Sequence, residues 1–347
     1  MTEEMLHIDG SMGEGGGQVL RSSLALSILT GRPVHITNMR SRRPKPGLQP
    51  QHLKAVQAAA EICGGQLRGA ALHSQQLFFE PGEVHPGRYR FDIGTAGQSG
   101  LVLQTIFLPL ARAKDSSNVT ITGGTHVPMS PCYHYLERLW LPALHECGFW
   151  ARTNMEQAGF YPIGGGVITA QIRRVEEIRP YERMERGALI RIRGISAVAN
   201  LDEGIARRQK LQALRRLEPL CPDSKIEIVQ LPSPGKGTML LLQAEFEHTT
   251  CCHFSLGAIG KRAEQVADDA VDELEAFLAT NGAVDEHLAD QLLLPLAFAS
   301  GPSRFRTSRV TLHLLTNAEV IHTFLPARIT IEGQEGQPGT VTIEPGA

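Results

Sequence analysis

The stretch that decides the fold is Ile8-Asp9-Gly10-Ser11-Met12-Gly13-Glu14-Gly15-Gly16-Gly17-Gln18-Val19-Leu20-Arg21. Four glycines surround the carboxylate of Glu14, and an apolar helical pattern begins at Gln18. Glycines adopt positive φ and let a ligand approach the backbone closely. Free N–H groups at the start of a helix also favour an anion. The stretch therefore predicts a strand-to-helix turn that handles phosphate.

This glycine turn differs from the two common phosphate-binding motifs. The order G-x-x-x-x-G-K-[ST] of a P-loop is absent, and no acidic residue on its own strand follows about 20 residues later, as a dinucleotide-binding fingerprint requires. A tight turn without any ligand is the alternative interpretation. Glu14 favours a ligand, because a carboxylate inside an anion-binding turn is best explained by a metal ion beside it.

The same pattern recurs along the chain. Turns that are rich in glycine or led by aspartate precede apolar helices near Gln18, Leu101 and Gln291. Each helix is followed by an expected strand, at 34–36, 119–121 and 309–313, and then by a second helix, at 51–63, 133–147 and 317–324. The sequence thus predicts an α/β (α+β) fold, in which three repeated βαβαββ units form a pseudo-symmetric core.

The middle of the chain breaks this rhythm. From about Arg186 to Thr280, expected strands and helices follow one another without a glycine turn. We interpret this stretch as a smaller α+β domain inserted between the second and third repeats. The expected domains are therefore 1–185 for the first two core repeats, 186–280 for the inserted domain and 281–347 for the third repeat.

Composition sets limits on function and location. The 347 residues are 42% hydrophobic and 20% charged, with a net charge of −2, so any contact with nucleic acid must be local. The six cysteines form no C-x-x-C motif, which argues against structural zinc and a disulfide framework. We expect no signal peptide, because the N-terminus is acidic and moves directly into an expected strand. We also expect no membrane span, because no apolar run reaches about 18 residues. A cytoplasmic location is the resulting expectation.

Arginines and lysine gather in a loop after the first repeat's second expected strand. Arg40, Arg42, Arg43 and Lys45 alternate there with prolines that stiffen the chain. Arginine forks bind phosphate oxygens two at a time, and Gln51 at the start of the next helix could reach the same phosphate. The alternative is a solvated surface loop. A second basic stretch, at 207–216, is explained by the solvated face of an amphipathic helix, with a contact to nucleic acid as the alternative.

His313 is the candidate nucleophile. It lies in Leu312-His313-Leu314-Leu315-Thr316-Asn317, where we expect the end of a strand and a following helix capped by Thr316 or Asn317. A lone histidine in such a place usually has a structural role. No Ser/His/Asp or Cys/His arrangement is evident. A neutral imidazole that faces a phosphate-binding turn is nevertheless well suited to attack phosphorus.

Five blocks of the sequence together resemble the RNA 3′-terminal phosphate cyclase family. The blocks occur in order over nearly the whole chain and are thinnest in the inserted region. They are Gly13–Gln18 with Arg21, the Arg40-x-x-Arg43-Pro44-Lys45-Pro46-Gly47 loop, Gln51-His52, His287-Leu288-Ala289-Asp290-Gln291, and His313-Leu314-Leu315-Thr316-Asn317. The resemblance implies a core of three repeated units with an inserted domain, as the repeats predict.

The resemblance also implies a reaction in three steps. His313 would attack the α-phosphorus of ATP through Nε2 and release pyrophosphate, which leaves a covalent histidine-AMP. The RNA 3′-phosphate would then take the AMP to give an RNA(3′)pp(5′)A intermediate. Finally, the neighbouring ribose O2′ would close a 2′,3′-cyclic phosphate and release AMP.

The resemblance assigns roles to further residues. Glu14 would hold Mg²⁺ or Mn²⁺. Phosphates would be bound by Gln18, Arg21, Arg40, Arg43 and Gln51. ATP or AMP would be bound by Gln104, Pro131, His287, Leu288, Ala289, Asp290 and Gln291. Each role has a structural alternative: Asp290 could cap a helix that starts at Gln291, and Pro131 could end a loop.

Other functions stay open at the level of sequence. One is a cyclase-like RNA-processing or scaffold protein that does not adenylate, although that branch would lack His313. An enolpyruvyl-transferase-like enzyme and a plain RNA-binding module are the others. The expected partner is RNA with a 3′-terminal phosphate. Aromatic residues are only 5% of the chain, so we expect recognition of the RNA end with little reading of sequence. The oligomeric state is left open.

Overall fold

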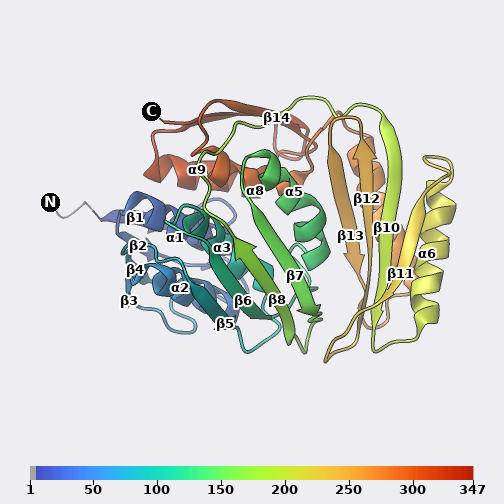
Figure 1. Ribbon diagram of the computed structural model, residues 1–347, viewed down its shortest axis with the longest axis horizontal. Coiled ribbons are helices and arrows are strands. Elements are labelled where there is room, and N and C mark those ends of the chain that lie inside the picture. Colours follow the sequence, from blue (N-terminus) through green and yellow to red (C-terminus); the bar gives the residue numbers. More distant parts are fainter. Residues whose placement is uncertain (1–4, 347) are drawn as a thin grey trace.

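The computed structural model describes residues 5–346, and its chain begins with a unit of four strands and two helices (Figure 1). The elements of this unit are β1 (Leu6–Asp9), α1 (Gly17–Thr30), β2 (Val34–Thr37), α2 (Pro50–Cys63), β3 (Gln66–Arg68) and β4 (Leu77–Glu80). Strand β1 pairs in parallel with β2, and the sheet order is β1-β2-β4-β3. The glycine turn connects β1 to α1, as the sequence predicts.

The second unit repeats this topology. Its elements are β5 (Arg88–Asp92), α3 (Ser99–Ala111), β6 (Ser117–Gly123), α4 (Tyr133–Tyr135), the π-helical turn η1 (Leu136–Trp140), α5 (Leu141–Glu146), β7 (Ala151–Gln157) and β8 (Gly166–Ile172). The sheet order is β5-β6-β8-β7, with β5 parallel to β6. As in the first unit, a glycine-rich turn connects the first strand, β5, to the first helix, α3.

The third unit has the same strand order but is interrupted. Its elements are β9 (Glu182–Arg183), α8 (Glu286–Leu296), β14 (Ser303–Thr307), α9 (Leu312–Phe324), β15 (Arg328–Glu332) and β16 (Gly339–Glu344). Strand β9 pairs in parallel with β14, so the sheet order is β9-β14-β16-β15. The three units share one topology, and the predicted fold class of repeated βαβαββ units is confirmed.

The inserted segment lies between β9 and α8 in the chain and forms a fourth sheet with two helices. Its elements are β10 (Leu189–Ala199), α6 (Glu203–Leu217), β11 (Lys225–Gln230), β12 (Gly237–Phe246), β13 (Thr250–Leu256) and α7 (Ala263–Leu278). We expected an insertion between the second and third repeats, but this segment interrupts the third unit after its first strand. Strand β9 has only two residues, too few for a recognisable pattern in the sequence.

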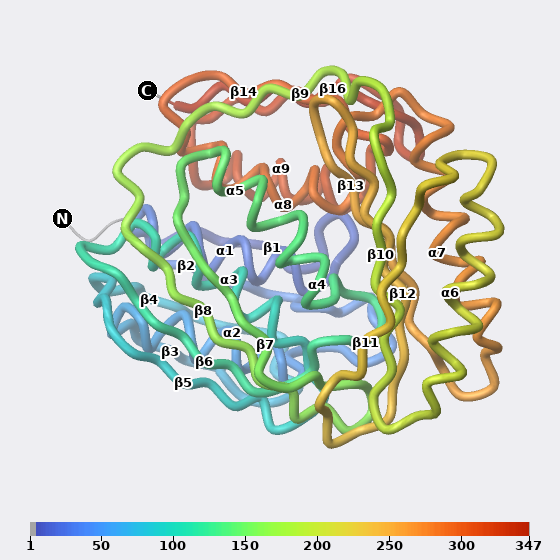
Figure 2. Tube along the Cα trace, turned by 45° about the vertical axis from the view of Figure 1, so that its right-hand side comes forward, coloured from blue at the N-terminus to red at the C-terminus, as the bar shows by residue number. Residues whose placement is uncertain are grey.

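The helices of the three core units pack against one another. Helix α1 contacts α2, α3 and α9, and α9 also contacts α8. Figure 2 shows the first and last units of the chain, blue and red, side by side. Most side chains of α1 are buried, which makes it a central helix. Within residues 5–346, no helix is both long and apolar enough to cross a membrane.

Two predicted boundaries in the third unit are wrong. The strand expected at 309–313 does not form, because α9 begins at Leu312 with Thr311 as its N-cap. The alternation of apolar residues there suggested a strand, yet the buried positions Leu314, Ala318 and Ile321 follow a helical period. Helix α8 begins at Glu286, so Asp290 lies inside it and does not cap a helix starting at Gln291.

Candidate active site

The glycine turn lies directly against the start of α9. Gly13 has φ 52°, and a Cβ at this position would meet Oγ1 of Thr316 at 1.9 Å. The backbone N–H of Glu14 donates to the same Oγ1 at 3.2 Å. Only glycine fits at position 13, because any side chain would separate the turn from α9. The turn therefore carries Glu14 to the helix that bears His313.

His313 lies in the first turn of α9 rather than at the end of a strand. Its Nδ1 is within hydrogen-bond distance of Oε1 of Gln18, while Nε2 of Gln18 donates to Oδ2 of Asp290 at 3.1 Å. A carboxylate only accepts hydrogen bonds, so Asp290 fixes the orientation of the Gln18 amide. The amide oxygen then requires a proton on Nδ1. His313 is thus held in the tautomer whose Nε2 carries a free lone pair.

Glu14 lies on the other side of this imidazole. Its Oε2 is 3.4 Å from Nε2 of His313, and the same carboxylate pairs with the guanidinium of Arg43. The Glu14 side chain is only 8% exposed, whereas that of His313 is 52% exposed. The half-exposed imidazole therefore has its Nε2 next to a buried carboxylate that pairs with an arginine.

Burial shifts the pKa values of two charged groups near His313. Burial raises the pKa of Asp290 to about 6, although His313, His287 and the Gln18 hydrogen bond oppose this shift. Burial also lowers the pKa of Arg21, against the attraction of Asp290 and Glu14. Asp290 is consequently an anion at neutral pH but loses its charge under mildly acidic conditions.

His52 lies close to the start of α1. A Cβ on Gly17 would meet Nε2 of His52 at 2.5 Å and a terminal nitrogen of Arg21 at 3.1 Å. Burial, together with the charges of Arg40 and Arg21, lowers the pKa of His52 to about 3. His52 is therefore neutral and supports the turn without adding charge.

The basic loop splits into two roles. Arg40 donates from Nε to the carbonyl oxygen of Gly47 at 3.2 Å and from a terminal nitrogen to that of Lys45 at 3.2 Å. It therefore holds the loop in shape. Arg43 instead reaches Glu14, and its Nε is a buried donor without a hydrogen-bond partner in the described part of the chain. A free buried donor beside a glycine turn suits an anionic ligand.

Gln51 and Pro131 both contact Gln98 in the second glycine turn, residues 92–98. Oε1 of Gln51 accepts the backbone N–H of Gln98 at 2.8 Å. The side-chain amide of Gln98 donates to the carbonyl oxygen of Pro131. These contacts link α2 of the first unit to the second unit and fix the path of both segments.

The segment 287–291 lies in α8, and its residues face different surroundings. Nε2 of Gln104 donates to Oε1 of Gln291 at 3.1 Å, which joins α3 to α8. Leu288 and Ala289 are buried in the core. Asp285 caps the helix through the N–H groups of residues 287 and 288 and accepts the hydroxyl of Tyr135 at 2.8 Å.

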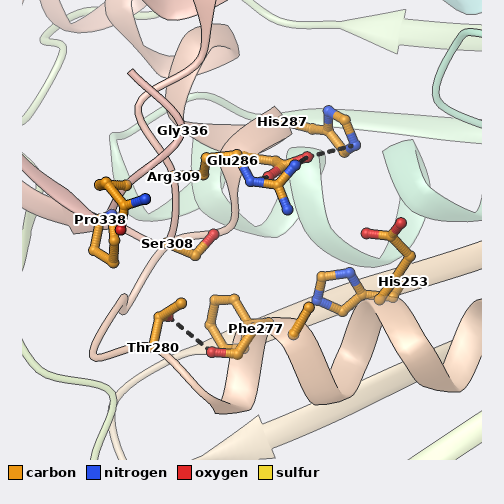
Figure 3. Close-up of a pocket in the computed structure, with 12 residues that line it drawn as sticks. His253, Phe277, Thr280, Glu286, His287, Ser308, Arg309, Gly336 and Pro338 are labelled. Carbon is orange, nitrogen blue, oxygen red and sulfur yellow. Dashed lines mark hydrogen bonds and ion pairs between the residues drawn. The ribbon is translucent and has the colours of Figure 1, made fainter. Parts of the chain in front are cut away.

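His287 lines a pocket next to the inserted segment and also lies close enough to Asp290 to lower the pKa of that carboxyl group. It is an exposed side chain that lines a pocket together with Glu286 and Arg309 from the third unit and His253 and Phe277 from the inserted segment (Figure 3). Glu14 and His313 are not among the residues that line this pocket. The structure thus brings Glu14, Gln18, Arg43, Asp290 and His313 into one cluster and leaves His287 at its own pocket.

The roles of several supporting residues were not predicted from the sequence. Thr311, not Thr316 or Asn317, caps α9 by accepting the backbone N–H of Leu314 at 3.1 Å. Asn317 donates to the carbonyl oxygen of Asp290 at 2.8 Å and accepts the hydroxyl of Ser22 at 2.6 Å. A threonine before a helical pattern is a recognisable cap, whereas the long-range pairing of Asn317 left no signal in the sequence.

A resident metal cluster is not evident. In the part of the chain that the structure describes, no group of three or more His, Cys, Asp or Glu side chains is arranged to hold a metal ion. A single buried carboxylate still suits Mg²⁺, which is often held by one or two carboxylates together with substrate phosphates and water. Glu14 has this character, and here its charge is balanced by Arg43.

The basic stretch of the inserted segment is mostly neutralised. Arg208 of α6 pairs with Glu264, and Arg216 pairs with Asp268, Asp272 and Glu275, all on α7. These arginines hold two helices of the same segment together. The contacts agree with the interpretation of this stretch as one face of an amphipathic helix.

Comparison with known proteins gives one consistent result. The model of the family described as RNA 3′-terminal phosphate cyclase matches residues 12–331. An RNA 3′-terminal phosphate cyclase of Pseudomonas fluorescens is 46% identical over 330 residues, which cover 95% of each chain. One from Nostoc punctiforme is 43% identical over 334 residues, covering 94% of this chain and 96% of the relative.

A solved structure also aligns with the chain. The enolpyruvyl transferase NikO from Streptomyces tendae covers 99% of this chain and 82% of its own, with 9% identity and a TM-score of 0.25. A match this weak carries no functional argument.

Proposed function

The chain belongs to the RNA 3′-terminal phosphate cyclase family and is an enzyme, and we propose that it uses ATP to convert an RNA 3′-terminal phosphate to a 2′,3′-cyclic phosphate. In the first step, Nε2 of His313 attacks the α-phosphorus of ATP; a P–N bond forms and pyrophosphate leaves. The RNA 3′-phosphate then takes the AMP from His313. The ribose O2′ finally attacks the activated phosphate and displaces AMP.

The observation that carries this proposal is the Asp290–Gln18–His313 chain of hydrogen bonds. It holds Nδ1 as the protonated nitrogen and leaves the lone pair of Nε2 free to attack. After attack, the imidazole bears a positive charge, and the Gln18 oxygen stabilises the Nδ1 proton. Nucleophilic catalysis needs a nucleophile whose correct form is prepared before substrate binds.

The phosphates are bound by cations around the glycine turn. Arg43 has a free buried Nε, and Arg21 lies behind the turn close to His52. Arg40 and Gln51 shape this site through their contacts with the basic loop and the second glycine turn. Glu14 would hold Mg²⁺ or Mn²⁺, which neutralises phosphate charge when bound. Preorganised positive charge is what phosphoryl transfer requires.

The nucleoside part of ATP lies along α3, α8 and the Pro131 loop in this proposal. Gln104 and Gln291 offer amides, Asp290 offers a carboxylate, and Pro131 offers an apolar surface. Leu288 and Ala289 are buried, so they would support the position of their neighbours in α8. His287 contributes only if the nucleotide extends to its pocket.

The chemical logic supports adenylation as the route. A ribose O2′ cannot expel oxide from a phosphate monoester at a useful rate, but it can expel AMP from an activated phosphate. The closing attack is intramolecular, so proximity supplies a large share of the rate. The six cysteines are all free, which suits the reducing cytoplasm where we propose that the enzyme works.

Incubation with Mg²⁺ and ATP labelled at the α-phosphate tests the proposal. The denatured wild-type protein should retain label that is lost in acid and survives alkali, and His313→Ala should retain none. His85→Ala, which removes an exposed imidazole in the first half of the chain, is the matched control and should label normally. Wild-type protein that takes up no label, or His313→Ala that labels normally, would contradict the proposal.

A further inference from the structure

Two large apolar side chains project into solvent from the 158–165 loop, which connects β7 to β8. Tyr161 is 67% exposed and Ile163 is 59% exposed. Scattered exposed apolar residues are ordinary, so their meaning depends on what holds them there and what lies next to them. Three features of this loop set it apart: its rigidity, its contact with the second glycine turn and its contact with the inserted segment.

Side-chain packing and hydrogen bonds hold the loop in place. Phe160 is buried and stacks on His126, with ring centroids 4.9 Å apart. The N–H of Gly164 donates to the carbonyl oxygen of Phe160 at 2.8 Å, and Nε2 of Gln157 donates to that of Gly165 at 2.7 Å. Because the loop is already ordered with its apolar side chains in water, binding of a ligand there would not carry the entropic cost of ordering the loop.

The loop packs directly on the second glycine turn. Gly164 has φ 70°, and a Cβ there would meet the Cα of Ala96 at 2.6 Å and the oxygen of Thr95 at 2.9 Å. On the other side of this turn, a Cβ on Gly97 would meet that of Gln51 at 2.9 Å. Backbone contacts therefore connect Tyr161 and its neighbours to Gln51, a residue of the proposed phosphate site.

The inserted segment adds a positive charge at the same place. A Cβ on Gly235 would meet Cβ of Ile163 at 3.1 Å, and the exposed Lys236 follows directly. Nδ2 of Asn200 donates to the carbonyl oxygen of Gly235 at 2.9 Å and so fixes this contact. An aromatic ring, an aliphatic side chain and an ammonium group are the components with which proteins bind single-stranded nucleic acid.

We propose that Tyr161 stacks on a base of the RNA substrate next to its terminal phosphate, with Ile163 extending the apolar surface and Lys236 contacting the RNA backbone. This inference rests on the proposed function, because it takes the RNA end to lie at Gln51. Stacking accepts any base, since every base has a flat π surface. The site would thus strengthen binding of the RNA end without selecting a sequence.

Kinetics with a 3′-phosphorylated oligoribonucleotide test the stacking role. Tyr161→Ala should raise KM for RNA about 5- to 100-fold, in line with the effect of removing one stacked base. Adenylation of His313 in the absence of RNA should keep its wild-type rate. Tyr161→Phe keeps the ring and should behave like wild type. Leu211→Ala removes a 65% exposed side chain from α6 and should change neither reaction.

A second arm identifies the partner of Tyr161. Two oligonucleotides are compared with the complete one: the first lacks the base of the last nucleotide, and the second lacks the base of the preceding nucleotide. One of them should bind wild-type enzyme more weakly than the complete oligonucleotide does. Tyr161→Ala should bind that oligonucleotide and the complete one with equal affinity. Lys236→Ala should lower the slope of log affinity against log salt by about 0.7, the value for one contact to a single strand.

Clear results would overturn the inference. An unchanged KM for RNA in Tyr161→Ala would do so, as would a slower adenylation without RNA, because the loop would then act on ATP or on folding. A changed oligomeric state with unchanged RNA binding would assign the loop to a protein interface instead. If wild-type enzyme takes up no label from ATP, the proposed function fails. The effect of Tyr161→Ala on RNA binding can still be measured in that case, by the fluorescence anisotropy of a labelled oligonucleotide.

Discussion

At the scale of single residues, the site depends on Gln18 more than its unremarkable chemistry suggests. The Gln18 amide is neutral and carries its donor and its acceptor on separate atoms, so it can donate to Asp290 and accept from His313 at the same time. A carboxylate in its place would repel Asp290, and an apolar side chain would leave Nδ1 of His313 without a partner. The buried Gln18 therefore links a half-buried acid to an exposed nucleophile.

The pH dependence of stability should reveal the buried acid. Because burial raises the pKa of Asp290 to about 6, this group stabilises the fold below its unfolded pKa near 3.8 and loses that contribution as pH rises through 6. Asp290→Asn keeps an oxygen that accepts from Gln18 and removes the charge. It should match wild type near pH 4 and be about 1–3 kcal/mol more stable at pH 7.

Denaturant unfolding from pH 4 to pH 7 measures this difference. Asp223→Asn removes an exposed carboxylate and is the control for the change in net charge. The difference in free energy of unfolding between Asp290→Asn and wild type should grow from pH 4 to pH 7. A difference that stays constant with pH, or that is larger at acidic pH, would show that the fold does not raise the pKa of Asp290.

At the scale of elements, the start of α9 decides where His313 stands. The residue lies two positions after the cap Thr311, in a turn whose N–H groups have no partners within the helix. The alternation of apolar and polar residues around His313 predicts the end of a strand. The cap, together with burial of Leu314 and Ile321 at helical spacing, selects the helix instead.

Removal of this cap should affect stability and chemistry together. Thr311→Ala leaves the N–H of Leu314 without its acceptor and should cost about 1 kcal/mol of the free energy of unfolding. The frayed first turn should also slow labelling of His313 by ATP. Thr311→Ser keeps the oxygen and should restore both properties. Equal behaviour of the alanine and serine variants in unfolding and labelling would rule out this role.

At the scale of the whole molecule, one arginine fastens the inserted segment where the chain leaves and re-enters the core. The guanidinium of Arg186 donates to the carbonyl oxygens of Phe277, Leu278 and Gly282 at distances from 2.8 to 3.2 Å. It also lies over the rings of Phe246 and Phe277, at 5.5 and 5.3 Å from their centroids. A cation at the carboxyl end of α7 is favoured by the helix dipole.

Loss of this arginine should loosen the inserted segment first. Arg186→Met leaves carbonyl groups at the end of α7 unpaired and should destabilise the protein by about 1–3 kcal/mol. Limited proteolysis should then cut near 186–188 and 279–283 sooner than in wild type. Arg186→Lys keeps the charge without the fork and should be intermediate. Arg215→Met, which removes an exposed arginine of α6, is the control. Unchanged proteolysis in Arg186→Met would contradict the fastening role.

The sequence by itself determined the repeats, the glycine turn and the identity of the nucleophile candidate, because these depend on local patterns of glycine, apolar spacing and short motifs. Only the tertiary structure decided which residues meet. Gln18 and His313 are 295 positions apart, and they touch because α1 packs against α9. The two-residue strand β9 likewise has no pattern of its own and is defined by its pairing with β14. Contacts between distant segments depend on packing, which one sequence read along its length does not contain.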